Sequence, residues 1–176
     1  VTLLLTSRER TRLLGEWVLA LDGLAVPAPG AEGELERSDA ARLFLERARQ
    51  ADAAFAPDAG ACVAIAQICR LVDGVPLAIE LAAAWVRALS CAEIAVELAH
   101  GPALLAAPEG AARRHGSMQA VFEQSWRLLS PEERRCLAAL SVFSAGFTRE
   151  AAAQVAGASL GVLAALIEKS LLRRRE

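Results

Sequence analysis

The sequence predicts a mainly α-helical protein that begins with two short strands. Of its 176 residues, 55% are apolar, and most of these are alanine, leucine and valine. Aromatic residues make up 5% and tyrosine is absent, a composition that suits closely packed helices better than a β-sandwich. Apolar residues recur at helical spacing from about residue 35 onward, so the remainder of the chain is expected to be helical.

The first 34 residues are predicted to contain the two strands and a linker. Residues 1–5 form a dense run of leucine and β-branched residues, and apolar side chains alternate along residues 17–21. Two strands alone make a poor sheet. We therefore expect either that residues outside this sequence complete the sheet, so that the chain is a fragment beginning inside a strand, or that the strands lie on the helices with an exposed edge. Prolines and glycines mark residues 23–34 as a linker.

Two helices are predicted next, each with one apolar face. Ser38 can cap a helix that runs to about residue 54. Pro57 and Gly60 precede a second helix over residues 61–72, and Gly74 is suited to end it. The side chains expected in the core are Phe44, Leu45, Ala48, Val63, Ile65, Ile68, Cys69 and Val72.

A third and a fourth helix complete this group, which ends near residue 101. Pro76 is preorganised for a first helical turn, and residues 77–89 are apolar nearly all round, which predicts the most buried helix. Ser90 and Glu93 have the spacing of a capping box, so a short helix should run from there to about residue 99.

A second helical group is predicted after a boundary at residues 102–116. Residues 130–133 supply an N-cap serine, a first-turn proline and a capping-box glutamate, the firmest helix start in the chain. The predicted helices begin at Ser117, Ser130, Thr148 and Leu160, and residues 171–173 are expected to begin a wing that is cut short.

Charge and residue spacing exclude several classes of protein. The net charge of −2 gives no overall electrostatic reason to bind nucleic acid or an anionic membrane. The longest apolar runs fall far short of the roughly 20 residues that span a bilayer, and no secretion leader is evident, so a cytoplasmic location is expected. The cysteines and histidines lack zinc-site spacing, which predicts buried reduced thiols and no metal site.

Two places carry residues suited to ligand binding. Arg8 follows the first predicted strand, and the carboxyl ends of strands in open α/β sheets are where ligands bind. Arg8 can reach a phosphate from there, or it is an ordinary surface arginine. Gly74 and Pro76 join two helices in a rigid corner that can hold a flat ring, or that serves only as a turn.

Four segments together resemble the NB-ARC-like STAND ATPases of LuxR-type and AfsR-type bacterial transcriptional regulators. They read TSRE at residues 6–9, CRLVDGVPLAIELAAA at 69–84, SPEER at 130–134 and LSVFSAGFT at 140–148. The resemblance covers nearly the whole chain. It implies the end of an α/β P-loop core over residues 1–34, a helical subdomain over 35–101, a linker over 102–116 and a winged-helix subdomain, its wing incomplete, over 117–176.

The resemblance also implies a function and a role for three residues. Arg8 would be the sensor arginine for the terminal phosphate of ATP, and its planar donor fork suits that task. Gly74 and Pro76 would form the family's glycine-x-proline turn beside adenine. The chain would thus be an ADP/ATP-sensing part of a conformational switch in transcriptional regulation, and its partners would be a P-loop subdomain and downstream sensor or effector domains.

The departures from the family bear on catalysis. No G-x-x-x-x-G-K-[ST] loop and no acidic strand end are present, so this chain should not hydrolyse ATP, although the resemblance implies that its parent does. The family's winged-helix histidine is also absent. Two alternatives stay open: a helical protein-interaction module, and a DNA-binding winged helix. For the second, residues 160–169 offer almost nothing that reads base edges, so we do not expect this chain to bind DNA sequence-specifically.

Overall fold

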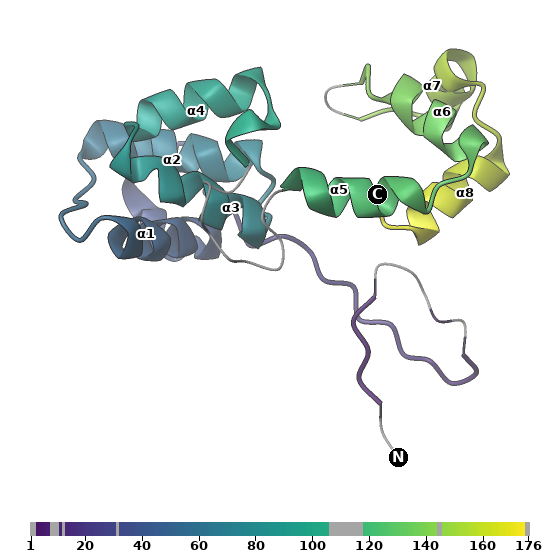
Figure 1. Ribbon diagram of the computed structural model, residues 1–176, viewed down its shortest axis with the longest axis horizontal. Coiled ribbons are helices and arrows are strands. Elements are labelled where there is room, and N and C mark those ends of the chain that lie inside the picture. Colours follow the sequence, from purple (N-terminus) through teal and green to yellow (C-terminus); the bar gives the residue numbers. More distant parts are fainter. Residues whose placement is uncertain are drawn as a thin grey trace. The chain divides into compact units, whose positions relative to one another are not determined.

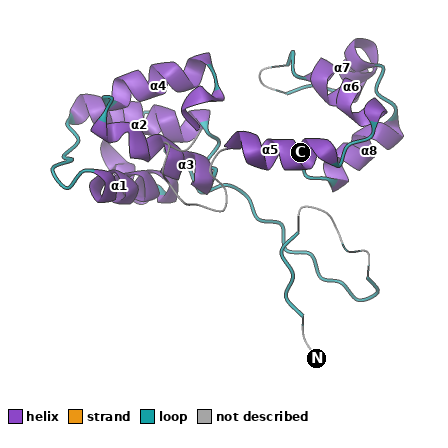
Figure 2. Cartoon of the chain, viewed as in Figure 1, coloured by secondary structure: helices purple, strands orange, loops and turns teal. Residues whose placement is uncertain are grey.

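A computed structural model describes residues 3–7, 11, 13–30, 32–105, 118–143 and 146–174. Every regular element among them is a helix, as Figure 2 shows. The chain forms two compact units, one of residues Leu21–Phe122 and one of Val1–Ala20 with Glu123–Glu176. The prediction of a mainly α protein is confirmed, and each unit is described by itself below.

We call the unit of residues 21–122 the helical unit. Before the start of α5 (Met118–Arg127), its described residues form the α-helices α1 to α4, labelled in Figure 1, and three short 3₁₀ helices. Helix α1 packs on α3, and α2 packs on α4. The largest fully buried side chains in the interior are Phe44, Ile65, Ile68, Ile79 and Ile94. The elements are η1 (Glu32–Arg37), α1 (Asp39–Ala51), α2 (Ala59–Leu71), α3 (Pro76–Ala83), η2 (Ala84–Arg87), α4 (Cys91–His100) and η3 (Pro102–Leu105).

Side-chain caps begin three of these helices. The predicted caps at Ser38 and Ser90 are confirmed, and Glu93 completes the capping box at α4. Helix α2 begins two residues earlier than predicted because the Asp58 carboxylate accepts the Ala61 N–H at 2.7 Å. The sequence contained this signal, since aspartate is a preferred N-cap residue.

Three details of the predicted helices are wrong. Helix α1 ends at Ala51 and not at about residue 54. Val63 was expected in the core but is 50% exposed, because at 100° per residue it lies on the face of α2 opposite the buried Ile65. The third helix was expected to run to residue 89, but α3 ends at Ala83 and continues as the 3₁₀ turn η2. In that turn the Trp85 ring N–H donates to the Leu104 carbonyl at 2.8 Å, which fixes η3 to the unit.

The second unit has its own core, and its described residues form three whole helices and the second half of α5, because the boundary between the units falls within α5. The helices are α5 (Met118–Arg127), α6 (Pro131–Leu140), α7 (Arg149–Ala156) and α8 (Leu160–Glu168). Leu129, Cys136, Leu140, Ala152 and Leu166 are buried between them. The predicted caps at Ser130 and Thr148 are present, while the predicted cap at Ser117 lies outside the described residues.

The predicted strands are not formed in the described residues. Residues 3–7 and 16–22 lack regular structure, and Leu4 and Trp17 are 95% and 98% exposed. A strand is stabilised by hydrogen bonds to a neighbouring strand, and no described residue provides that neighbour. The short wing strand predicted at residues 171–173 is absent for the same reason.

All four cysteines lie in the described residues as free thiols. Cys69, Cys91 and Cys136 are buried, and Cys62 is half-buried. Burial raises the pKa of the Cys69 thiol to about 12, because a thiolate would lose its hydration there. Cys69 is thus a packing residue, consistent with the prediction of buried thiols.

The described residues contain no single helix that is long and apolar enough to cross a membrane. Helices α7 and α8 together have the length and apolar composition of a membrane span, but the chain bends by 107° between them.

Candidate functional site

The glycine-proline corner is a tight turn between α2 and α3. Asp73 and Gly74 both have positive φ, 48° and 66°, and the Val75 N–H donates to the Val72 carbonyl at 3.0 Å. These features define a type I′ turn, for which Asp-Gly is a preferred pair. The Gly74 N–H also donates to the Cys69 carbonyl at 3.1 Å, which closes the end of α2.

Gly74 is required here for a second reason, the close approach of the linker. A Cβ atom added at Gly74 would lie 2.1 Å from the Leu24 carbonyl oxygen, and one added at Gly23 would lie 2.4 Å from the Asp73 carbonyl oxygen. The Leu24 N–H donates to the Gly74 carbonyl at 2.9 Å. The two glycines therefore allow the linker backbone to lie directly against the corner.

The linker is also held at its far side. The Ala25 carbonyl accepts from the Ser38 hydroxyl at 2.6 Å and from the Ala40 N–H at 3.2 Å. The Arg70 guanidinium donates to the Pro27 carbonyl at 3.3 Å. Hydrogen bonds to the turn, to the start of α1 and to α2 thus make this segment part of the helical unit.

Helix α3 begins at the corner without a side-chain cap. Its N-cap residue is Val75, which offers only its backbone carbonyl, to the Ile79 N–H at 3.0 Å. Six other α-helices have a cap side chain at their starts: Ser38, Asp58, Ser90, Ser130, Thr148 and Ser159. The N–H groups of Leu77 and Ala78 belong to the first turn, where no intrahelical acceptor exists. Pro76 is exposed and Leu77 is half-buried, whereas Ala78 is buried. The corner therefore combines an exposed apolar ring with donors at the positive end of a helix.

Gly74 and Pro76, two of the three predicted site residues, lie in this corner. The third, Arg8, lies outside the described residues. The predicted convergence of Arg8 with the corner stays a prediction. Sequence reasoning missed the contribution of Gly23, whose only signal was its place in a linker rich in glycine and proline.

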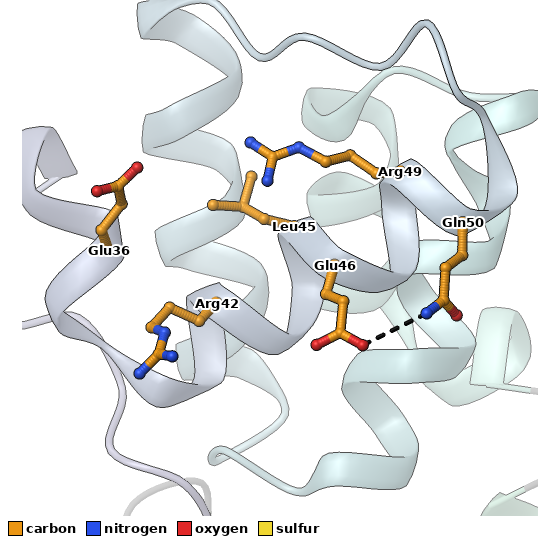
Figure 3. A pocket seen from close by; sticks show the side chains of 6 residues that line it. All are labelled: Glu36, Arg42, Leu45, Glu46, Arg49 and Gln50. Atoms are coloured by element: carbon orange, nitrogen blue, oxygen red, sulfur yellow. Dashed lines mark hydrogen bonds between the residues drawn. The ribbon is translucent and has the colours of Figure 1, made fainter.

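A separate open groove of about 540 Å³ lies along α1 and η1. Figure 3 shows the side chains that line it: Glu36, Arg42, Leu45, Glu46, Arg49 and Gln50. The Gln50 amide donates to Glu46 at 3.3 Å, and the two arginines and two glutamates balance in charge. The groove contains neither Gly74 nor Pro76, so it is not the predicted site.

A polar cluster joins three helices of the second unit. The Lys169 ammonium group donates to Glu133 at 2.7 and 2.9 Å and to the Leu128 carbonyl at 3.2 Å. The hydrogen bond from Lys169, and then that from the Ser130 N–H, lower the pKa of the Glu133 carboxyl group below its ordinary range. Glu133 is only 7% exposed. The SPEER motif thus helps to hold α6 against α8, because its capping residue Glu133 forms an ion pair with Lys169 at the end of α8.

Helices α7 and α8 have the geometry of a helix-turn-helix. They bend by 107° across three residues, and Gly157 takes the left-handed conformation that ends α7. The exposed side of α8 carries Leu160, Ala164 and Ile167. Glu168 is also exposed on α8, but its carboxylate repels phosphates. The surface therefore offers no positive charge for phosphates, and Glu168 is its one charged side chain for base edges. Among the described residues, no cluster of histidine, cysteine or carboxylate groups suits a metal ion.

Comparison with known proteins gave a small set of relatives. No family profile and no solved structure matches the chain. It is similar to an uncharacterized protein of Mycobacterium tuberculosis and to one of Mycobacterium bovis, each 37% identical over 182 residues that cover 98% of this chain and 44% of the relative. It is also similar to a Mycobacterium tuberculosis protein named "Putative HTH-type transcriptional regulator", 33% identical over 180 residues that cover 98% of this chain and 19% of that protein. The chain therefore spans less than half the length of these relatives.

Proposed function

We propose that this chain is the nucleotide-sensing part of a STAND-type signalling ATPase that acts in transcriptional regulation. The observation that carries the proposal is the corner at Gly74 and Pro76, where a rigid turn presents an exposed proline beside an uncapped helix start. The name of the 33% identical relative supports the regulatory setting.

The residues of the corner fit one end of an ADP or ATP molecule. The exposed face of the Pro76 ring offers apolar contact to adenine, while the N–H group of Leu77 can donate to a ring nitrogen. The type I′ turn fixes the direction in which these groups point, so little conformational entropy is lost when a base binds. Phosphate binding would depend on Arg8 and on a P-loop subdomain outside this sequence, so this chain by itself would not hydrolyse ATP.

The exposed apolar segments fit the same proposal. Residues 3–5 and 17–21 carry leucines and a tryptophan that a folded protein normally buries. As strands of a sheet completed by the P-loop subdomain, they would bury these side chains and satisfy their backbone groups. Arg8 would then lie at the carboxyl end of the first strand, close to the terminal phosphate.

Titration of the chain with ADP tests the proposal. Amide NMR should show saturable shifts at Leu77 and Ala78 at up to millimolar ADP, and Pro76→Ala should weaken binding several-fold because the adenine contact is lost. Gly60→Ala is the control, since Gly60 lies in the first turn of α2, where the nearest atom to an added Cβ is an Asp58 carboxylate oxygen at 3.4 Å, an ordinary contact distance. Absence of any shift at millimolar ADP would favour a helical protein-interaction module instead.

DNA binding is the other alternative, since α7 and α8 have the angle of a helix-turn-helix. The apolar outer face of α8 argues against it. A gel shift on duplex DNA over a range of salt concentrations should show only weak, strongly salt-dependent binding. Tight binding at physiological salt would overturn this ranking.

A further inference from the structure

We propose that Gly23 is a positioning residue for the nucleotide site, and that the linker is the connection through which that site and residues 17–21 influence one another. The inference rests on the proposed function. The backbone of the linker lies against the corner, a contact that no local sequence rule requires.

The contact depends on two residues that both lack a side chain. A Cβ atom at Gly23 would lie 2.4 Å from the Asp73 carbonyl oxygen and 3.1 Å from the Gly74 carbonyl carbon. These are backbone atoms of the turn, so no side-chain rotation could relieve the overlap. Gly23 does not have a positive φ, so its backbone conformation alone would accept alanine. Replacing Gly23 therefore disturbs the contact without disturbing local backbone preference.

The corner cannot move away freely when the linker is disturbed. The turn is tied to α2 by the Gly74 N–H, and Pro76 begins α3, whose Ala78 and Ile79 lie in the core. On its other side the linker is anchored at Ala25 by the start of α1. An added methyl group at Gly23 must therefore shift either the Asp73-Gly74 backbone, and with it Pro76, or the linker that leads back to residues 17–21.

This arrangement couples residues 17–21 to Pro76, which lies 55 residues after Leu21 in the sequence. A movement of residues 17–21 would displace Gly23 and Leu24. Through the 2.9 Å hydrogen bond from the Leu24 N–H to the Gly74 carbonyl, it would also displace Pro76. A base held at the corner would in turn favour one position of the linker. Because such coupling is reciprocal, a variant that breaks the contact should change nucleotide affinity even though Gly23 need not touch the ligand.

The test compares ADP binding by the whole 176-residue chain and by three variants, followed by amide NMR. Gly23→Ala should shift the amide signals of Leu24, Gly74 and Leu77 and weaken ADP binding several-fold, as expected for Pro76→Ala. Gly60→Ala, in a part of the helical unit with room for a methyl group, should leave the affinity unchanged. Ile79→Val, which loosens the core of α3 without touching the linker, should lower thermal stability but not affinity.

The results distinguish failure of the proposed function from failure of the positioning role of Gly23. If the wild-type chain does not respond to ADP, the proposed function fails for this chain and the inference fails with it. If the wild type binds but Gly23→Ala binds equally well, only the positioning role is refuted. Equal losses of affinity in Gly23→Ala and Ile79→Val would assign the effect to stability and also refute it. Should Gly23→Ala not fold, Leu24→Pro, which removes the N–H that donates to the Gly74 carbonyl, replaces it in the same comparison.

Discussion

Replacing Gly74 by alanine tests the geometry of the corner directly. Gly74 has a φ of 66°, and the left-handed conformation costs a residue with a Cβ atom about 1–2 kcal/mol. The new Cβ would also lie 2.1 Å from the Leu24 carbonyl oxygen, so the linker must move away. That movement breaks the Leu24–Gly74 hydrogen bond, which contributes a further amount of about 1 kcal/mol. The expected loss in the free energy of unfolding of the helical unit is roughly 2–3 kcal/mol.

Three other glycines separate the two contributions. Gly157 has a φ of 58° with no atom within 4 Å of an added Cβ, so Gly157→Ala should show the conformational cost alone, about 1–2 kcal/mol in its own unit. Gly23→Ala should show only the free-energy cost of the overlap between the added Cβ and the turn backbone. Gly60→Ala has neither feature and should be neutral or stabilising by up to about 1 kcal/mol, because alanine favours helix.

Residue-resolved hydrogen exchange suits this series because it reports the opening free energy of each unit separately. The Leu24 amide should lose protection in Gly74→Ala and Gly23→Ala, and should keep it in Gly60→Ala and Gly157→Ala. If Gly74→Ala costs no more than Gly157→Ala, and the Leu24 amide is equally protected in both, the linker does not lie on the corner and the reasoning is refuted.

The second unit and the nucleotide site give further predictions. Glu133 has a lowered pKa in the folded state, so its ion pair with Lys169 should stabilise the unit above the unfolded pKa of about 4.3 and lose that effect as the pH falls through the folded pKa. Glu133→Gln should therefore lower the free energy of unfolding by about 1–3 kcal/mol at pH 7. Urea unfolding from pH 3 to 7 should also show a weaker dependence of that free energy on pH, and an unchanged dependence would contradict the ion pair. Ser130→Ala should lower the stability of the same unit by about 1 kcal/mol, because it removes the α6 cap, and a change below about 0.3 kcal/mol would argue against that cap. Pro76→Ala should raise the ADP dissociation constant while the melting temperature stays near that of the wild type, and an unaltered constant would remove the adenine contact.

Local rules predicted the parts of this structure that depend on neighbours within one turn of chain. Ser38, Ser90 and Ser130 each place a side-chain oxygen near N–H groups three residues ahead, so these helix starts could be read directly. The Asp-Gly pair and Pro76 marked the corner, because their backbone preferences are intrinsic to the residues. Arg8, Gly74 and Pro76 came together as a site only through the family resemblance, and the role of Arg8 stays a prediction.

The sequence by itself determined where the described helices begin and how the corner turns, since those are preferences of single residues and their near neighbours. Helical periodicity also indicated most of the buried side chains of α1 and α2, although Val63 is exposed. Tertiary structure alone decides whether apolar residues 17–21 become a strand, since that requires a partner for their backbone groups. It also brought Gly23 against Gly74 and Lys169 against Glu133, pairs 51 and 36 residues apart. Contacts between segments this distant are set by how whole helices pack, and no short window of sequence contains that information.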